Sequence, residues 1–249
     1  VALGATFEDS AGNAITAVNA TFTTMALQST VATQPPYNAS SNKYVVSTLG
    51  HLSYIAQNTS FWTYNYIQKA DIDATVTKYW DDADDNSDGD KYNDANDKTD
   101  SGSDNGFSPI GNSTIYFTGD YDGDENTIHG LTITRSSNTY DTGLFGRAQG
   151  STISDLGLTD VNVTGLDRVG PLAGLAYTTE ISNCFATSGN VNGRSIVGGL
   201  VGYLLDASIT NSYSNIDNVT SSSNYVGGLV GRISASTILN SYSTGKVVS

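Results

Sequence analysis

The clearest set of potential ligands in the sequence is an aspartate-rich segment at residues 81–104. Carboxylate and amide oxygens alternate along it and a glycine follows, as in the first half of a calcium-binding loop. The twelfth position of that loop holds Ala95 instead of a bidentate glutamate, so the segment is not an EF-hand. We predict a calcium site with the following ligands: Asp84, Asn86, Asp88, Asp90 and Asp94, with Asp97 as the alternative closing ligand.

The same segment carries most of the charge of the chain. It contains ten aspartates and two lysines, a net charge of −8 out of −14 for all 249 residues. Residues 161–249 contain four acidic and four basic residues, so the acidic segment interrupts a nearly neutral scaffold. Crowded carboxylates repel one another unless a cation neutralises them, which favours bound Ca²⁺ over a solvated acidic insertion.

Composition excludes several classes of protein. A pI near 4.1 argues against nucleic acid as a partner, because that partner requires a positive patch. The single cysteine, Cys184, excludes an intrachain disulfide and a cysteine-based zinc site. No apolar run approaches 18 residues, so we expect no membrane insertion. Low charge content and abundant Ser, Thr, Asn and Gly are typical of a β-rich extracellular protein.

Other residues with chemical potential are weaker candidates. Asp120, Asp122 and Asp124 alternate beside a glycine, but a turn accounts for them better than a second cation site. His51 and His129 lie in no catalytic or metal-binding motif, so we expect packing or surface roles for both. Because Cys184 has no identifiable base, we predict no catalytic residue and no enzymatic activity.

An internal repeat predicts the architecture that must position these residues. A Gly-Leu-x-Gly tetrapeptide, or Pro-Leu-Ala-Gly in the second unit, begins at positions 143, 171, 199 and 228, at intervals of 28, 28 and 29 residues. Two further landmarks keep the same spacing. They are Ile153, Ile181, Ile209 and Ile238, and then Val163, Val191, Val219 and Val248.

Each unit contains three short strand-like stretches separated by Gly, Asn, Ser and Asp. Such strands bury an apolar face only when one unit stacks on the next. We therefore predict an all-β fold, a right-handed parallel β-helix over residues 107–249, with one three-sided coil per unit. Leu144, Leu172, Leu200 and Leu229 should fill its interior.

Two polar features follow from this stacking. Asn183, Asn211 and Asn240 should form an amide ladder at a turn, where asparagine tolerates left-handed backbone. Asp155 takes this place in the first unit, so we expect that coil to be less regular. Arg147 also follows the tetrapeptide in one unit and Arg232 in another, which places both on the same side of the solenoid.

The N-terminal half should close the end of the solenoid. Apolar residues at helical spacing follow Ser47 or Thr48, either of which is a suitable N-cap, and predict a short capping helix. We assign residues 44–106 to this capping segment and its acidic loop. Residues 1–43 alternate weakly, and we expect strands and a linker there.

The repeat units at 198–214 and 227–243 resemble the GLUG repeats of large bacterial surface proteins. Upstream sequences resemble the segment that commonly precedes such repeats: Ala70 to Ala74, Phe107 to Gly111 and Phe117 to Gly123. The resemblance covers roughly residues 44–249. It implies an extracellular β-helix, found in adhesins and as an accessory region of some surface proteases. It brings no catalytic residues.

We expect a non-enzymatic structural or adhesive protein of the cell surface, an adhesin stalk or a filament subunit. An open β-helix end is an unpaired edge, so neighbouring copies or further repeats are the expected partners, together with surface glycans. The alternative is a β-helix that binds or processes polysaccharide. Eliminative cleavage of a uronate polymer in calcium buffer would distinguish that alternative.

The calcium assignment makes a prediction about stability. When the free Ca²⁺ concentration is 100 times the dissociation constant of the site, binding adds about 2.7 kcal/mol to the free energy of unfolding. The melting temperature should therefore rise with millimolar Ca²⁺ and fall with a chelator, and Asp84→Ala combined with Asp88→Ala should abolish the response. An unchanged melting curve, with no metal found by elemental analysis, would leave the segment as solvated acid.

Overall fold

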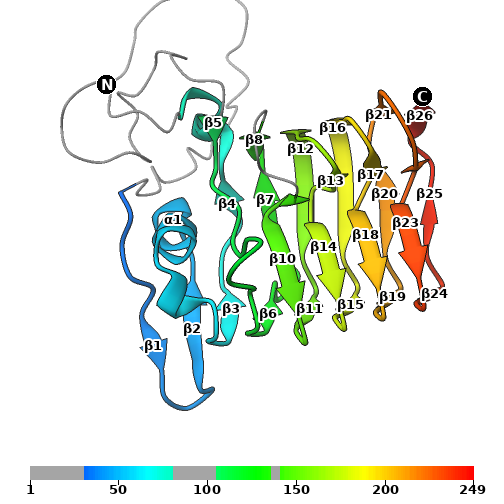
Figure 1. The fold of residues 1–249 in the computed structure, drawn as a ribbon. Coiled ribbons are helices and arrows are strands. Elements are labelled where there is room, and N and C mark those ends of the chain that lie inside the picture. Colours follow the sequence, from blue (N-terminus) through cyan, green and yellow to red (C-terminus); the bar gives the residue numbers. More distant parts are fainter. Residues whose placement is uncertain (1–30, 81–104, 136–140) are drawn as a thin grey trace, which may run out of the picture.

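The fold is a parallel β-solenoid whose strands stack along one axis (Figure 1). We describe it from a computed structural model, which describes residues 31–80, 105–135 and 141–249. Four successive coils, beginning at residue 141, place a strand in each of four sheets, I to IV. In these residues no helix has the length and apolar character needed to cross a membrane.

Sheets I and II contain strands that recur once per coil. Sheet I consists, in spatial order, of β1 (Tyr37–Asn38), β2 (Lys43–Val46), β3 (Tyr66–Gln68), β6 (Tyr121–Asp122), β11 (Thr152–Ser154), β15 (Glu180–Ser182), β19 (Ser208–Thr210) and β24 (Thr237–Leu239). Sheet II consists of β10 (Phe145–Gln149), β14 (Ala173–Tyr177), β18 (Val201–Leu205) and β23 (Val230–Ser234). Only the β1–β2 pair of these two sheets is antiparallel.

Sheets III and IV complete each coil. The main path of sheet III is β25 (Tyr242–Ser243), β20 (Tyr213–Asn215), β16 (Phe185–Gly193), β12 (Gly157–Thr164), β7 (Thr127–His129) and β4 (Ile72–Asp73). Beside that path lie β21 (Asn218–Ser221), β26 (Lys246–Val248), β8 (Thr132–Thr134) and β5 (Asn105–Gly106). Sheet IV is β22 (Val226–Gly227), β17 (Ile196–Gly198), β13 (Arg168–Val169) and β9 (Asp141–Thr142).

The predicted three-sided coil is therefore too simple. The additional strand in each unit is a sheet IV strand of two or three residues, immediately before the tetrapeptide. A strand this short shows no alternation in the sequence. Parallel pairing also extends upstream of residue 107, because β2, β3 and β4 join the same stack.

The predicted capping helix is present as α1 (Leu49–Gln57), near the N-terminal end of the stack (Figure 1). Thr48 is its N-cap, and the side-chain oxygen accepts a hydrogen bond from His51 N at 3.2 Å. Leu49, Leu52 and Ile55 are buried against the core. Two 3₁₀ turns follow, η1 (Thr59–Phe61) and η2 (Thr75–Tyr79).

The register confirms most of the predicted ladders. Ile153, Ile181, Ile209 and Ile238 are paired in succession along sheet I. The valine ladder of sheet III runs through Val163, Val191 and Val219 as predicted. Its last member is Val247, not Val248, because β21 pairs with β26 in that register.

The interior is apolar along its length. Leu144, Leu172 and Leu200 are almost completely buried, and Leu229 packs against the same core while partly exposed. Aromatic rings also stack from coil to coil at the edge of sheet III. Phe185 and Tyr213 have ring centroids 5.1 Å apart and nearly parallel planes, and Tyr213 and Tyr242 repeat this at 5.3 Å.

The amide positions lie at turns, as predicted. Asn183, Asn211 and Asn240 all have φ near +50°, and Asn240 Nδ2 donates to Asn211 Oδ1 at 3.3 Å. The prediction that Asp155 makes its coil less regular is wrong. Asp155 has φ 55° and accepts a hydrogen bond from Asn183 Nδ2 at 2.8 Å, since a carboxylate oxygen accepts as an amide oxygen does.

The final glycine of the tetrapeptide lies where sheets II and IV approach each other. A Cβ on Gly174 would lie 2.4 Å from the backbone nitrogen of Thr142 in the preceding coil. At Gly202 the corresponding distance, to Val169 N, is 2.6 Å. No larger residue fits between the two backbones, which explains why glycine recurs at this place in each unit.

The buried leucines make the first structural prediction. Leu200→Asp should unfold the solenoid, because a buried carboxylate without a partner costs several kcal/mol. Far-UV circular dichroism should show loss of the β signal. Leu239→Asp is the matched control at a side chain 56% exposed, and it should keep the signal. Retention of the fold by Leu200→Asp would contradict the packing.

The close approach of sheets II and IV makes the second structural prediction. Gly202→Ala should lower the free energy of unfolding by about 2–3 kcal/mol, because the new methyl group displaces backbone. Gly150→Ala is the control, since φ is +62° there but a Cβ meets no atom within 4 Å. It should cost only about 1 kcal/mol, from backbone torsion. Equal losses in urea denaturation would refute the steric argument.

Candidate functional site

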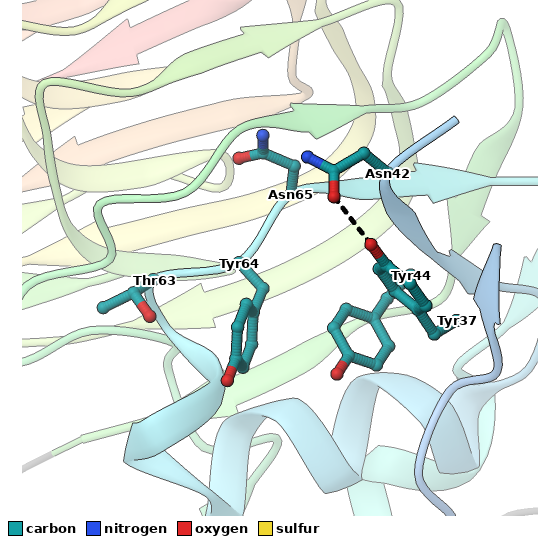
Figure 2. Close-up of a pocket in the computed structure, with 6 residues that line it drawn as sticks. All are labelled: Tyr37, Asn42, Tyr44, Thr63, Tyr64 and Asn65. Atoms are coloured by element: carbon teal, nitrogen blue, oxygen red, sulfur yellow. Dashed lines mark hydrogen bonds between the residues drawn. The ribbon is translucent and has the colours of Figure 1, made fainter. Parts of the chain in front are cut away.

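An exposed pocket lined by tyrosine and asparagine is formed by the capping segment and the residues just before it (Figure 2). Its volume is about 360 Å³, and none of the residues lining it is charged. The β1–β2 hairpin supplies part of the lining and the segment between η1 and β3 the rest. The lining residues are Tyr37, Asn42, Tyr44, Thr63, Tyr64 and Asn65.

Backbone contacts fix both halves of the pocket. Tyr44 N donates to Asn65 O at 2.8 Å, which ties the hairpin to the second segment. Asn65 Oδ1 accepts a hydrogen bond from Asp120 N at 2.9 Å. A Cβ on Gly119 would lie 1.8 Å from Tyr64 O, so the chain before β6 packs directly against the backbone of Tyr64.

Tyr44 is at the centre of an aromatic cluster. Its ring centroid lies 5.2 Å from those of Tyr37 and Tyr64 and 5.3 Å from that of Phe61. In Figure 2 the hydroxyls of Tyr44 and Tyr64 point the same way, with the side chains of Asn42 and Asn65 at the opposite end. Tilted contacts of this kind stabilise the arrangement of the rings.

Several polar groups of the pocket have no partner within the part of the chain that the structure describes. Tyr37 Oη donates to Asn42 Oδ1 at 2.6 Å, which leaves both hydrogens of Asn42 Nδ2 unused. The side-chain nitrogen of Asn65 and the hydroxyls of Tyr44 and Tyr64 likewise form no hydrogen bond with the described residues. The pocket thus combines aromatic surface with donors and acceptors free to bind a ligand.

The electrostatic character of the pocket is neutral. Burial raises the pKa of Tyr44, with smaller contributions from Tyr64 and Tyr37, so its hydroxyl stays protonated at neutral pH. Burial also raises the pKa of Tyr66. The hydroxyl of Tyr66 donates a hydrogen bond to Phe61 O. Uncharged hydroxyls and amides favour a neutral polar ligand over an ion.

The predicted calcium ligands Asp84, Asn86, Asp88, Asp90 and Asp94 lie outside the described residues, as does the alternative, Asp97. Among the residues that are described, no group of three or more His, Cys, Asp or Glu side chains is placed to hold a metal ion.

The second group of aspartates is engaged in protein contacts. Asp122 pairs with Lys43 at 2.9 Å and Asp124 with Lys69 at 2.7 Å. Asp120 Oδ1 accepts a hydrogen bond from Thr152 N at 2.8 Å. These partners fit the expected turn.

The two histidines and the cysteine have structural contacts. His51 Nδ1 accepts from Ser47 N at 3.1 Å at the start of α1, and burial lowers the pKa of His51. His129 Nδ1 lies 3.1 Å from Thr159 Oγ1. Cys184 is buried in a column of small residues, where burial raises its pKa to about 12. A thiol with that pKa is a poor nucleophile at neutral pH.

Sequence reasoning missed a buried ionic cluster. Asp141, whose side chain is only 3% exposed, contacts both Arg147 and Arg168. Burial raises the pKa of Asp141, and the two guanidinium groups oppose that effect. Asp141 and Arg168 are paired neighbours in sheet IV, which the sequence pattern did not reveal.

The tyrosine pocket was also missed, although the sequence contains a signal for it. Residues 37–66 hold seven of the 24 aromatic residues of the chain. A core alone would bury such residues, whereas Tyr37 and Tyr64 are substantially exposed. The density of aromatics beside Asn42 and Asn65 therefore indicates a surface site in addition to a core.

Comparison with known proteins agrees with the fold. The model of the GLUG motif matches residues 193–220 and 222–248. The structure is similar to the crystal structure of a "putative immunoglobulin A1 protease" from Bacteroides ovatus, with a TM-score of 0.53 and 16% identity, over 84% of this chain and 71% of that one. No curated protein matches the sequence. Residues 193–248 are thus a GLUG-repeat region, formed by the last coils of the β-solenoid.

Proposed function

We propose that this chain is a non-enzymatic adhesive module of an extracellular or cell-surface protein, with the solenoid as a stiff spacer. The observation that carries the proposal is the neutral tyrosine–asparagine pocket, exposed near the N-terminal end of a regular stack of coils. Each coil pairs with its neighbours in parallel register, and such solenoids present extended surfaces for binding. Calcium bound by residues 81–104 belongs to the same proposal as a stabilising ion.

The chemistry of the pocket favours a neutral saccharide on a partner surface. The rings of Tyr44 and Tyr64 offer apolar faces to the carbon-bound hydrogens of a sugar. Asn42 Nδ2, Asn65 Nδ2 and the tyrosine hydroxyls can exchange hydrogen bonds with its hydroxyl groups. A charged ligand would find no counter-charge among the lining residues.

Binding to an array of neutral glycans tests the proposal, followed by titration calorimetry with the best ligand. Tyr64→Ala should weaken that binding about 10- to 30-fold, because it removes one aromatic wall of the pocket. Tyr79→Ala is a matched control, since Tyr79 is 45% exposed against 44% for Tyr64 and lies outside the pocket.

The control variant should bind as the unmodified protein does. Circular dichroism of both variants checks that the fold is retained. Binding of no neutral glycan, or equal weakening by the two substitutions, would contradict the assignment of this pocket.

The second candidate function is processing of an acidic polysaccharide. The observation that favours it is Arg232, which lies on the surface of the coils between two tyrosine rings. Incubation with a uronate polymer in calcium buffer, followed by ultraviolet absorbance of the unsaturated product, tests it. Product formation would overturn the non-enzymatic proposal. Absence of product at a high concentration of this protein would exclude the reaction.

A further inference from the structure

A second surface cavity lies between sheets II and IV, on different coils from the tyrosine pocket. Its volume is about 390 Å³, within the range of small-ligand sites. Its lining residues come from consecutive coils: Asp167, Arg168, Ser195, Ile196, Tyr203, Tyr225 and Arg232. The predicted alignment of Arg147 and Arg232 is confirmed, since the register runs from Arg147 through Leu175 and Tyr203 to Arg232.

Arg232 is a cation without an acidic partner in the described part of the chain. Its guanidinium carbon lies 5.1 Å from the ring centroid of Tyr203 and 5.2 Å from that of Tyr225. Its nitrogens form no hydrogen bond or ion pair with the described residues. Cation–π contact with two rings limits the freedom of the side chain. Its N–H groups remain available for a planar anion, which guanidinium binds through two parallel hydrogen bonds.

The other arginines on this side of the solenoid have carboxylate partners. Arg147 and Arg168 share Asp141, and Arg194 pairs with Asp167 at 2.6 Å. Two arginines share one carboxylate, so the Asp141 cluster keeps a net positive charge, and its Arg168 lines the same cavity. Arg232 is the arginine of this group with no carboxylate partner among the described residues, so we expect an external carboxylate to bind there.

The same cavity contains acceptors for hydroxyl groups. Both hydrogen bonds from Arg194, at 3.0 and 2.6 Å, end on Asp167 Oδ1. Asp167 Oδ2 has no partner among the described residues, and neither has the hydroxyl of Ser195. A carboxylate oxygen accepts but does not donate, so it favours a ligand that also carries O–H groups.

We propose that this cavity binds a sugar acid, with its carboxylate on Arg232 and its hydroxyls on Asp167 and Ser195. Tyr225 and Ile196 supply apolar surface for the ring. An acidic peptide would satisfy Arg232 equally well, but it offers Asp167 and Ser195 only backbone N–H and C=O groups in place of a ring of adjacent hydroxyls. The site is independent of the tyrosine pocket, so its test is separate from that of the adhesive function proposed above.

The test is a titration of the whole chain in which NMR monitors the Nε–Hε signal of Arg232. That signal is assigned as the one missing from the spectrum of Arg232→Gln. The probes are trigalacturonate and sialyllactose, with the methyl ester of each as the uncharged counterpart and triglutamate as the acidic peptide. At least one sugar acid should shift the signal. Its ester and triglutamate should bind at least tenfold more weakly.

The affinities of two variants distinguish binding at Arg232 from non-specific attraction to positive charge. Arg232→Gln should weaken binding of the sugar acid about 10- to 100-fold, since charge-assisted hydrogen bonds are lost. Lys246→Gln removes the same charge from β26 in sheet III and should leave binding unchanged. The proposal is overturned if neither sugar acid binds, if ester or triglutamate binds as tightly, or if both variants behave alike.

Discussion

The structure depends on the parallel stacking of coils whose sheets II and IV approach to backbone contact. Glycine at the end of each tetrapeptide is what permits that approach, because a Cβ on Gly174 or Gly202 would overlap the strand of the preceding coil. Once this spacing holds, the residues one unit apart fall into register. The isoleucine, valine and leucine ladders then bury a continuous apolar interior that no single coil can enclose.

Features that repeat were predictable from the sequence, because stacking places identical residues next to one another. The ladder that begins at Ile153 and the Asn183 turn with positive φ followed from spacing alone. Predictions failed where the pattern gave only residue type. Asp155 looked like a defect, yet it accepts the hydrogen bond that an amide would accept. The valine ladder ends at Val247 and not at the predicted Val248, a shift of one residue that sequence spacing does not resolve.

The surface sites were harder to predict because their residues come from segments that do not repeat together. The tyrosine pocket joins a hairpin to a loop, and the two meet because β2 pairs with β3 and Tyr44 N donates to Asn65 O. Asp141 is similar, since its two arginine partners lie 6 and 27 residues further along the chain. Composition shows that such residues exist, whereas their contacts depend on how many strands each coil contains.

Placement of charge explains how an acidic protein can offer a site to an anion. The net charge is −14, but residues 161–249 carry four acidic and four basic groups. Fields of exposed charges decay over about 8 Å at physiological ionic strength, so the nearest groups dominate at any cavity. Around Arg232 those groups are Arg168, which shares Asp141 with Arg147, and the ion pair of Arg194 with Asp167. The excess positive charge of Arg232 is therefore felt locally, whatever the sign of the whole chain.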